Sequence, residues 1–130
     1  MAKLLLVTAD GLLAKAYSTR LGRMGHQVDW QSTGHDALAR ARREIPELIL
    51  LDATLPGLHG LDVLKFLRDV PPLVKVPVIL LIERTLSREI VQQCRMWGAG
   101  SCVEKDTCSL EELTRHVAQA LQPVPVAPSV

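Results

Sequence analysis

Short apolar runs alternate with longer amphipathic stretches along the whole chain. The runs cover residues 4–7, 28–30, 48–51, 76–82 and 102–103, and the amphipathic stretches cover residues 13–24, 34–43, 61–68, 87–97 and 110–121. Strands that alternate regularly with helices are typical of βα units built on a parallel sheet. The pattern therefore predicts an α/β fold of (βα)5 type, a doubly wound three-layer sandwich.

The polarity of individual segments predicts their place in this sheet. Residues 48–51 are all apolar, which indicates a central strand buried on both faces. Val28 and Trp30 alternate with polar residues, so the second strand is expected at an edge of the sheet. In the fourth helix the spacing predicts that four side chains face the core, namely Ile90, Val91, Cys94 and Trp97.

Length and composition fit one globular domain. The chain has 130 residues, 48% of them hydrophobic, with a net charge of +1, which excludes overall disorder and a large basic field for nucleic acid or anionic membrane. We expect one domain over residues 1–121, followed by a proline-containing tail or linker over 122–130. The first apolar run is too short for a signal peptide or a membrane span, so we expect a cytoplasmic protein.

The candidate chemistry lies at the carboxyl ends of the predicted strands, where open parallel sheets place their functional groups. Asp52 ends the central strand, and Lys105 follows the fifth strand. A carboxylate that faces an ammonium group can handle a phosphoryl group, because the carboxylate is a nucleophile and the ammonium neutralises the added charge. The same two residues could equally form a purely structural ion pair in this cleft.

The order and spacing of several motifs resemble the receiver domain of response regulators, the CheY-like family, over residues 3–121. The likeness rests on the segments 46–52 and 55–60, on Gly98-Ala99 with Lys105, and on residues 110–113. It implies a flavodoxin-like sheet of order 2-1-3-4-5 and a role in two-component, phosphorelay signalling.

The resemblance also implies roles for three positions. Asp52 takes the place of the phosphoacceptor, Lys105 that of the lysine that pairs with the phosphoryl group, and the Thr54 carbonyl that of a metal ligand. Any metal site would then use Asp10, Asp52 and Thr54.

Other positions depart from the family pattern. Thr8 and Ala9 stand where the family has two adjacent acids that hold magnesium, and only the next residue, Asp10, is acidic. Ile82 stands at the family's switch position for a Ser or Thr, whose hydroxyl bonds to a phosphoryl oxygen. Cys102 stands at the second switch position, where the family has an aromatic residue that changes rotamer.

These departures predict a degenerate receiver. Magnesium prefers several oxygen ligands in octahedral geometry, so we expect weak metal binding, no required cofactor, and slow or absent phosphorylation of Asp52. We expect a protein-interaction module without turnover activity, bound by a histidine kinase or a downstream signalling protein. By family likeness its partner surface is the side formed by the fourth and fifth helices with the fifth strand, which carries Arg88, Glu89, Gln92, Gln93 and Arg95.

Besides the degenerate receiver there are three alternatives, and the residues disfavour the second and the third. The first is a conventional receiver that accepts a phosphoryl group at Asp52, which the retained Lys105 and Leu-Pro-Gly loop favour. The second is a phosphatase-like hydrolase, which would need a second acid where Thr54 stands. The third is a flavodoxin-like electron carrier, which would need a hydroxyl-rich phosphate loop after the first strand.

Overall fold

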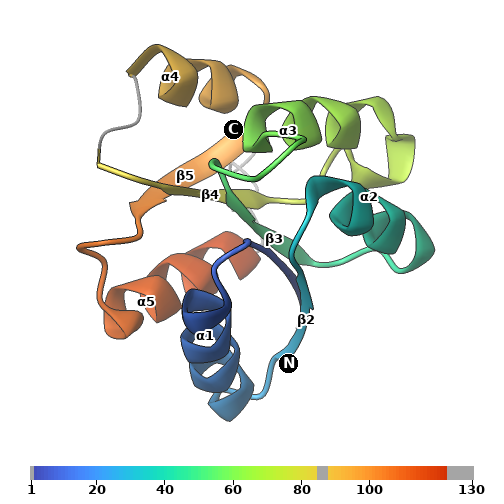
Figure 1. Ribbon diagram of the computed structural model, residues 1–130. Helices are drawn as coiled ribbons and strands as arrows, with labels where there is room; N and C mark the ends of the chain where they lie inside the picture. Colours follow the sequence, from blue (N-terminus) through green and yellow to red (C-terminus); the bar gives the residue numbers. More distant parts are fainter. Residues whose placement is uncertain (1, 85–87, 123–130) are drawn as a thin grey trace, which may run out of the picture.

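The computed structural model describes residues 2–84 and 88–122, in which five strands and five α-helices alternate (Figure 1). The strands are β1 (Lys3–Val7), β2 (Gln27–Gln31), β3 (Leu48–Asp52), β4 (Val78–Ile82) and β5 (Ala99–Glu104). The helices are α1 (Gly11–Arg23), α2 (Gly34–Arg43), α3 (Gly60–Asp69), α4 (Arg88–Met96) and α5 (Leu110–Leu121), with a short 3-10 helix, η1 (Pro71–Leu73). The predicted (βα)5 architecture is confirmed.

All neighbouring strands are parallel, in the order β2-β1-β3-β4-β5, as predicted. Every residue of β3 is buried, and β2 lies at an edge of the sheet. The strand order changes direction between β1 and β3, where Val7 pairs with Leu51. This register places Thr8, which follows β1, beside Asp52 at the end of β3.

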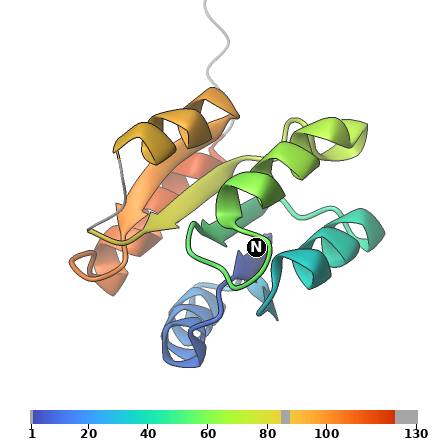
Figure 2. The same ribbon diagram turned by 45° about the horizontal axis from the view of Figure 1, so that its top comes forward.

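Helices cover both faces of the sheet, as Figures 1 and 2 show from two directions. α1 and α5 bury Tyr17, Leu21, Leu113 and Val117 against one face. α2, α3 and α4 cover the other face with a second apolar cluster, which includes Leu38, Leu64 and Cys94. The two clusters make the three-layer arrangement stable, because apolar side chains of β1, β3, β4 and β5 are removed from water.

α4 differs from the prediction, because two of its expected core residues are exposed. Ile90 is 37% and Trp97 40% exposed, and Cys94 is the buried residue of this helix. The helix contacts β5, which lies at the edge of the sheet, and Cys94 is its buried contact with the core. Trp97 instead lies outside, with the Lys65 ammonium 5.7 Å from the centre of its ring.

Two strand boundaries also differ, each for a local reason. β4 begins at Val78 rather than at residue 76, because Pro77 has no N–H group for the sheet. β5 begins already at Ala99, since Gly98 with φ 93° turns the chain directly from α4 into the strand. The predicted tail falls outside the described residues from position 123 onward.

The loop after β3 is held tightly against the start of α3. A Cβ atom on Gly60 would lie 2.6 Å from the Asp52 carbonyl oxygen, so only glycine fits there. The Gly60 N–H also donates to the Ala53 carbonyl at 3.2 Å. These contacts fix the backbone around Asp52.

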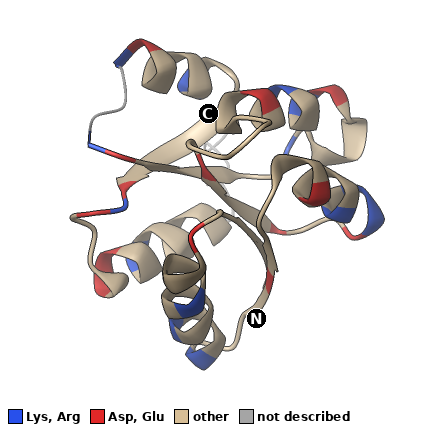
Figure 3. Cartoon of the chain, in the orientation of Figure 1, with Lys and Arg blue, Asp and Glu red and all other residues tan. Residues whose placement is uncertain are grey.

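The charged residues are spread over the molecule. Figure 3 shows basic and acidic positions on most helices, whereas α1 carries basic residues only. No helix in the described part of the chain is both long enough and apolar enough to cross a membrane.

Candidate functional site

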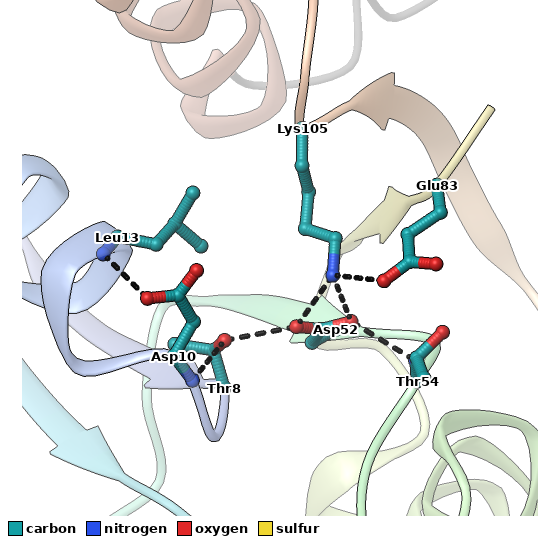
Figure 4. A network of polar contacts seen from close by, with 7 residues as sticks. All are labelled: Thr8, Asp10, Leu13, Asp52, Thr54, Glu83 and Lys105. Atoms are coloured by element: carbon teal, nitrogen blue, oxygen red, sulfur yellow. Dashed lines mark hydrogen bonds and ion pairs between the residues drawn. The ribbon is translucent and has the colours of Figure 1, made fainter.

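The candidate site lies at the carboxyl edge of the sheet, where four strands deliver one functional residue each. Thr8 follows β1, Asp52 ends β3, Glu83 follows β4 and Lys105 follows β5 (Figure 4). The Lys105 N–H donates to the Ile82 carbonyl at 2.9 Å, which holds the end of β5 beside the end of β4. The lysine side chain is thereby aimed back towards Asp52.

The Asp52 carboxylate receives four hydrogen bonds, two at each oxygen (Figure 4). Oδ1 accepts the Thr54 N–H at 2.9 Å and the Lys105 Nζ at 3.0 Å. Oδ2 accepts the Thr8 hydroxyl at 2.8 Å and the same Nζ at 3.0 Å. A carboxylate has about four lone-pair sites in all, so protein donors fill the capacity of this one.

Lys105 holds a second carboxylate as well as Asp52. Its Nζ lies 3.5 Å from Glu83 Oε1, and its side chain is only 12% exposed, whereas that of Glu83 is 47% exposed. Charge-assisted bonds in so sheltered a place are stronger than bonds at the open surface. The ammonium is therefore fixed between a buried and an exposed acid.

Asp10 is engaged in the structure of α1. Its Oδ1 accepts the N–H groups of Leu12 at 3.0 Å and Leu13 at 3.1 Å, so it caps the helix. Such a cap satisfies backbone donors that have no partner within the helix. Its neighbour Ala9 offers only a methyl group.

The residues present do not fit a magnesium ion well. Magnesium favours an octahedral set of oxygen ligands that includes one or two available carboxylates. Here the Asp52 oxygens already accept protein donors and the Asp10 carboxylate caps a helix. Within residues 2–84 and 88–122, no group of three or more acidic, His or Cys residues is arranged to hold a metal.

The two expected switch positions lie beside this network, but their side chains contribute no polar group to it. Ile82 and Cys102 are partly buried and pack against the apolar cluster under α2, α3 and α4. Neither has a hydroxyl for a phosphoryl oxygen or an aromatic ring that could change rotamer.

Tyr17 lies in the apolar cluster between the sheet and α1. Its hydroxyl is buried without a hydrogen-bond partner among the described residues. Burial raises the pKa of Tyr17 to about 12, with smaller contributions from Cys108 and from the Asp52 carboxylate. The phenol therefore stays protonated throughout the physiological pH range.

Two features of the site were not predicted from the sequence. The Thr8 hydroxyl is a donor to Asp52, although the sequence identified this position only as the loss of an acid. The Trp30 indole N–H donates to the Thr8 carbonyl at 2.9 Å. A tryptophan at the end of a predicted strand is a weak signal, because the partner carbonyl is 22 residues away in sequence.

The chain resembles known proteins over most of its length. A sequence model of the response regulator receiver domain matches residues 4–118. The transcriptional regulatory protein AfsQ1 of Streptomyces coelicolor is 36% identical over 91 residues, which cover 70% of this chain and 39% of that protein. The CpxR homolog of Haemophilus influenzae, also a transcriptional regulatory protein, is 35% identical over 121 residues, covering 88% of this chain and 48% of that one.

Solved structures show the same fold. The chemotaxis protein CheY4 of Vibrio cholerae superposes with a TM-score of 0.86 at 26% identity, over 93% of this chain and 99% of that one. The chain spans between 30% and 50% of the length of the first five curated relatives.

Proposed function

The chain belongs to the response-regulator receiver family of two-component signalling, and on this premise we propose that it is a degenerate receiver that signals through protein contacts. The observation that carries this proposal is the Asp52 carboxylate, whose two oxygens already accept four bonds from Thr8, Thr54 and Lys105. In this proposal Asp52 and Lys105 hold the carboxyl edge of the sheet together.

Electrostatics supports slow or absent phosphorylation of Asp52. A phosphoryl donor brings several negative charges to a site that already holds Asp52 and Glu83, and both of these acids pair with the Lys105 ammonium. Metal ions normally supply most of the compensating positive charge in phosphoryl transfer. An attacking Asp52 oxygen would also give up a bond to a protein donor, which raises the barrier further.

The switch positions support the same conclusion. In the family, a hydroxyl at the end of β4 and an aromatic residue on β5 follow the state of the phosphoacceptor. Ile82 and Cys102 lack these groups and pack in an apolar cluster. A modified Asp52 would thus have no conventional route to α4.

We place the partner surface on α4, β5 and α5, as family likeness suggests. The polar side chains of α4 expected there are all exposed, namely Arg88, Glu89, Gln92, Gln93 and Arg95. Ile90 and Trp97 add exposed apolar surface beside them. The partner in this proposal is a histidine kinase or a downstream signalling protein, which would bury this apolar surface.

The proposal is tested by intact-mass measurement after incubation with acetyl phosphate and excess Mg²⁺. The samples are the parent protein, Asp52→Asn, and an ordinary receiver that is modified under the same conditions. We expect no phosphoryl adduct on the parent protein. An adduct on the parent that is absent from Asp52→Asn would overturn the proposal.

The second candidate is a conventional receiver, and the retained pair of Asp52 and Lys105 favours it. In that case the Asp52 oxygen forms a bond to phosphorus and acetate leaves from the donor. The same mass measurement separates the two candidates, because only the conventional receiver gains a phosphoryl group at Asp52.

A further inference from the structure

Trp30 reaches from the edge strand β2 over the loop that follows β1. Its indole N–H donates to the Thr8 carbonyl at 2.9 Å, and its ring lies 3.9 Å from the point where a Cβ on Gly11 would stand. The residue is 45% exposed. One side of the ring therefore faces the loop beside Asp52 while much of the side chain faces solvent.

Thr8 is held by a bond at each of its polar groups. Its N–H donates to the Gln31 carbonyl at 3.2 Å and its carbonyl accepts from Trp30. Its hydroxyl accepts the Asp10 N–H at 3.2 Å and donates to Asp52 Oδ2. Because the Asp10 N–H and the Asp52 carboxylate can only donate and accept respectively, the Thr8 hydroxyl directs its hydrogen towards Asp52 and a lone pair towards Asp10.

We propose that Trp30 is a positioning residue, whose indole N–H holds Thr8 so that the Thr8 hydroxyl bonds to Asp52. These two hydrogen bonds link the β2 edge to the state of the Asp52 carboxylate. The inference deepens the proposed function and rests on it, since it describes how the Thr8 contact that replaces the missing acid is maintained. The link consists of two consecutive hydrogen bonds through one buried residue.

The stiffness of Thr8 makes this link effective. A β-branched side chain has few χ1 rotamers, so a displacement of its backbone moves the hydroxyl as well. Hydrogen bonds in a buried network also polarise one another. Of the polar contacts of Asp52, the one through Lys105 leads to exposed Glu83, and the one through Thr8 leads to exposed Trp30.

The chain offers a direct test, because its two tryptophans give two indole N–H signals in a proton–nitrogen NMR spectrum. Trp30→Phe and Trp97→Phe each remove one signal and so assign both. We expect Asp52→Asn to shift the Trp30 signal more than the Trp97 signal. In the Thr8→Val background, Asp52→Asn is expected to leave the Trp30 signal in place, because the hydroxyl that connects the two groups is gone.

The reciprocal measurement does not depend on the folding of Thr8→Val. Trp30→Phe is expected to shift the Thr54 amide signal, whose N–H donates to Asp52, and Trp97→Phe is the matched control that leaves it in place. Coupling between two sites acts in both directions. A Trp30 signal that ignores Asp52→Asn, or that shifts equally with valine at position 8, overturns the inference.

The outcomes also separate the inference from the proposed function. A phosphoryl adduct on the parent protein, together with a Trp30 signal that follows Asp52, refutes the proposed function and retains the link. No adduct together with an unresponsive Trp30 signal refutes the link alone.

Discussion

Replacing Thr8 with valine tests how much the Thr8 hydroxyl, which stands where the family has an acid, stabilises the fold through its bond to Asp52. Valine has nearly the shape of threonine but cannot donate to Asp52 Oδ2, which accepts the Thr8 hydroxyl at 2.8 Å. The residue is fully buried, so water has no direct access to replace the lost donor. The change therefore removes the donor to the carboxylate and the acceptor of the Asp10 N–H, with little loss of packing. The loss of the bond from Asp10 is common to backgrounds with and without the Asp52 carboxylate.

The expected loss of stability follows from the hydrogen bond between the Thr8 hydroxyl and the Asp52 carboxylate. A hydrogen bond to a charged group contributes about 1.5–3 kcal/mol to the free energy of unfolding. Burial of the additional methyl group offsets about 0.8 kcal/mol of the loss. We expect a net loss of about 1–2 kcal/mol, which lowers the Tm of a domain of this size by about 4–8 °C.

The assay is urea unfolding of four proteins: the parent, Thr8→Val, Asp52→Ala and the double variant. In such a cycle the coupling free energy between two contacting residues becomes visible. We expect Thr8→Val to cost less in the Asp52→Ala background than in the parent, by about 1–2 kcal/mol. An equal cost in both backgrounds would show that the Thr8 hydroxyl does not stabilise the fold through Asp52.

Three further predictions concern charge, burial and pH. Asp52→Asn should destabilise the domain by about 2 kcal/mol in urea unfolding, because it leaves a sheltered lysine ammonium without its buried partner; a gain in stability would contradict this. Tyr17→Phe should leave the stability unchanged or raise it by about 1 kcal/mol, since the buried hydroxyl has no partner among the described residues; a clear loss would show that it has one. Burial lowers the pKa of His26 below its usual value of 6.5, and its Nδ1 accepts a backbone N–H. The unfolded chain therefore takes up a proton more readily than the folded chain, and the free energy of unfolding falls as the pH is lowered from about 7.5 to 5.5. The His26→Gln variant should lose less stability over the same interval.

The fold could be predicted because each layer has its own pattern of polarity. The apolar run of β3 indicated the central strand, and alternation around Val28 and Trp30 indicated the edge strand β2. α4 was predicted less well, because helical spacing shows which residues share a face of the helix but not how much of that face the rest of the protein covers. Ile90 shares a face with Cys94, yet Ile90 is exposed whereas Cys94 is buried.

The candidate site could be predicted only as a set of positions. The ends of parallel strands converge, so the sequence indicated that Thr8, Asp52 and Lys105 would be neighbours. It could not show that Thr8 donates to Asp52, or that Asp10 caps a helix, because such bonds depend on side-chain rotamers. The contact of Trp30 with Thr8 depends on how β2 lies beside β1, and no local pattern records that.

We propose that the residues at positions 8 and 9 keep Asp52 from being phosphorylated. The most direct measurement is the intact mass of the parent protein beside Thr8→Asp/Ala9→Asp, both incubated with acetyl phosphate and Mg²⁺, with circular dichroism to verify the fold of each. We predict a phosphoryl adduct on the double variant and none on the parent. Modification of the parent to the same extent as the double variant would contradict the account.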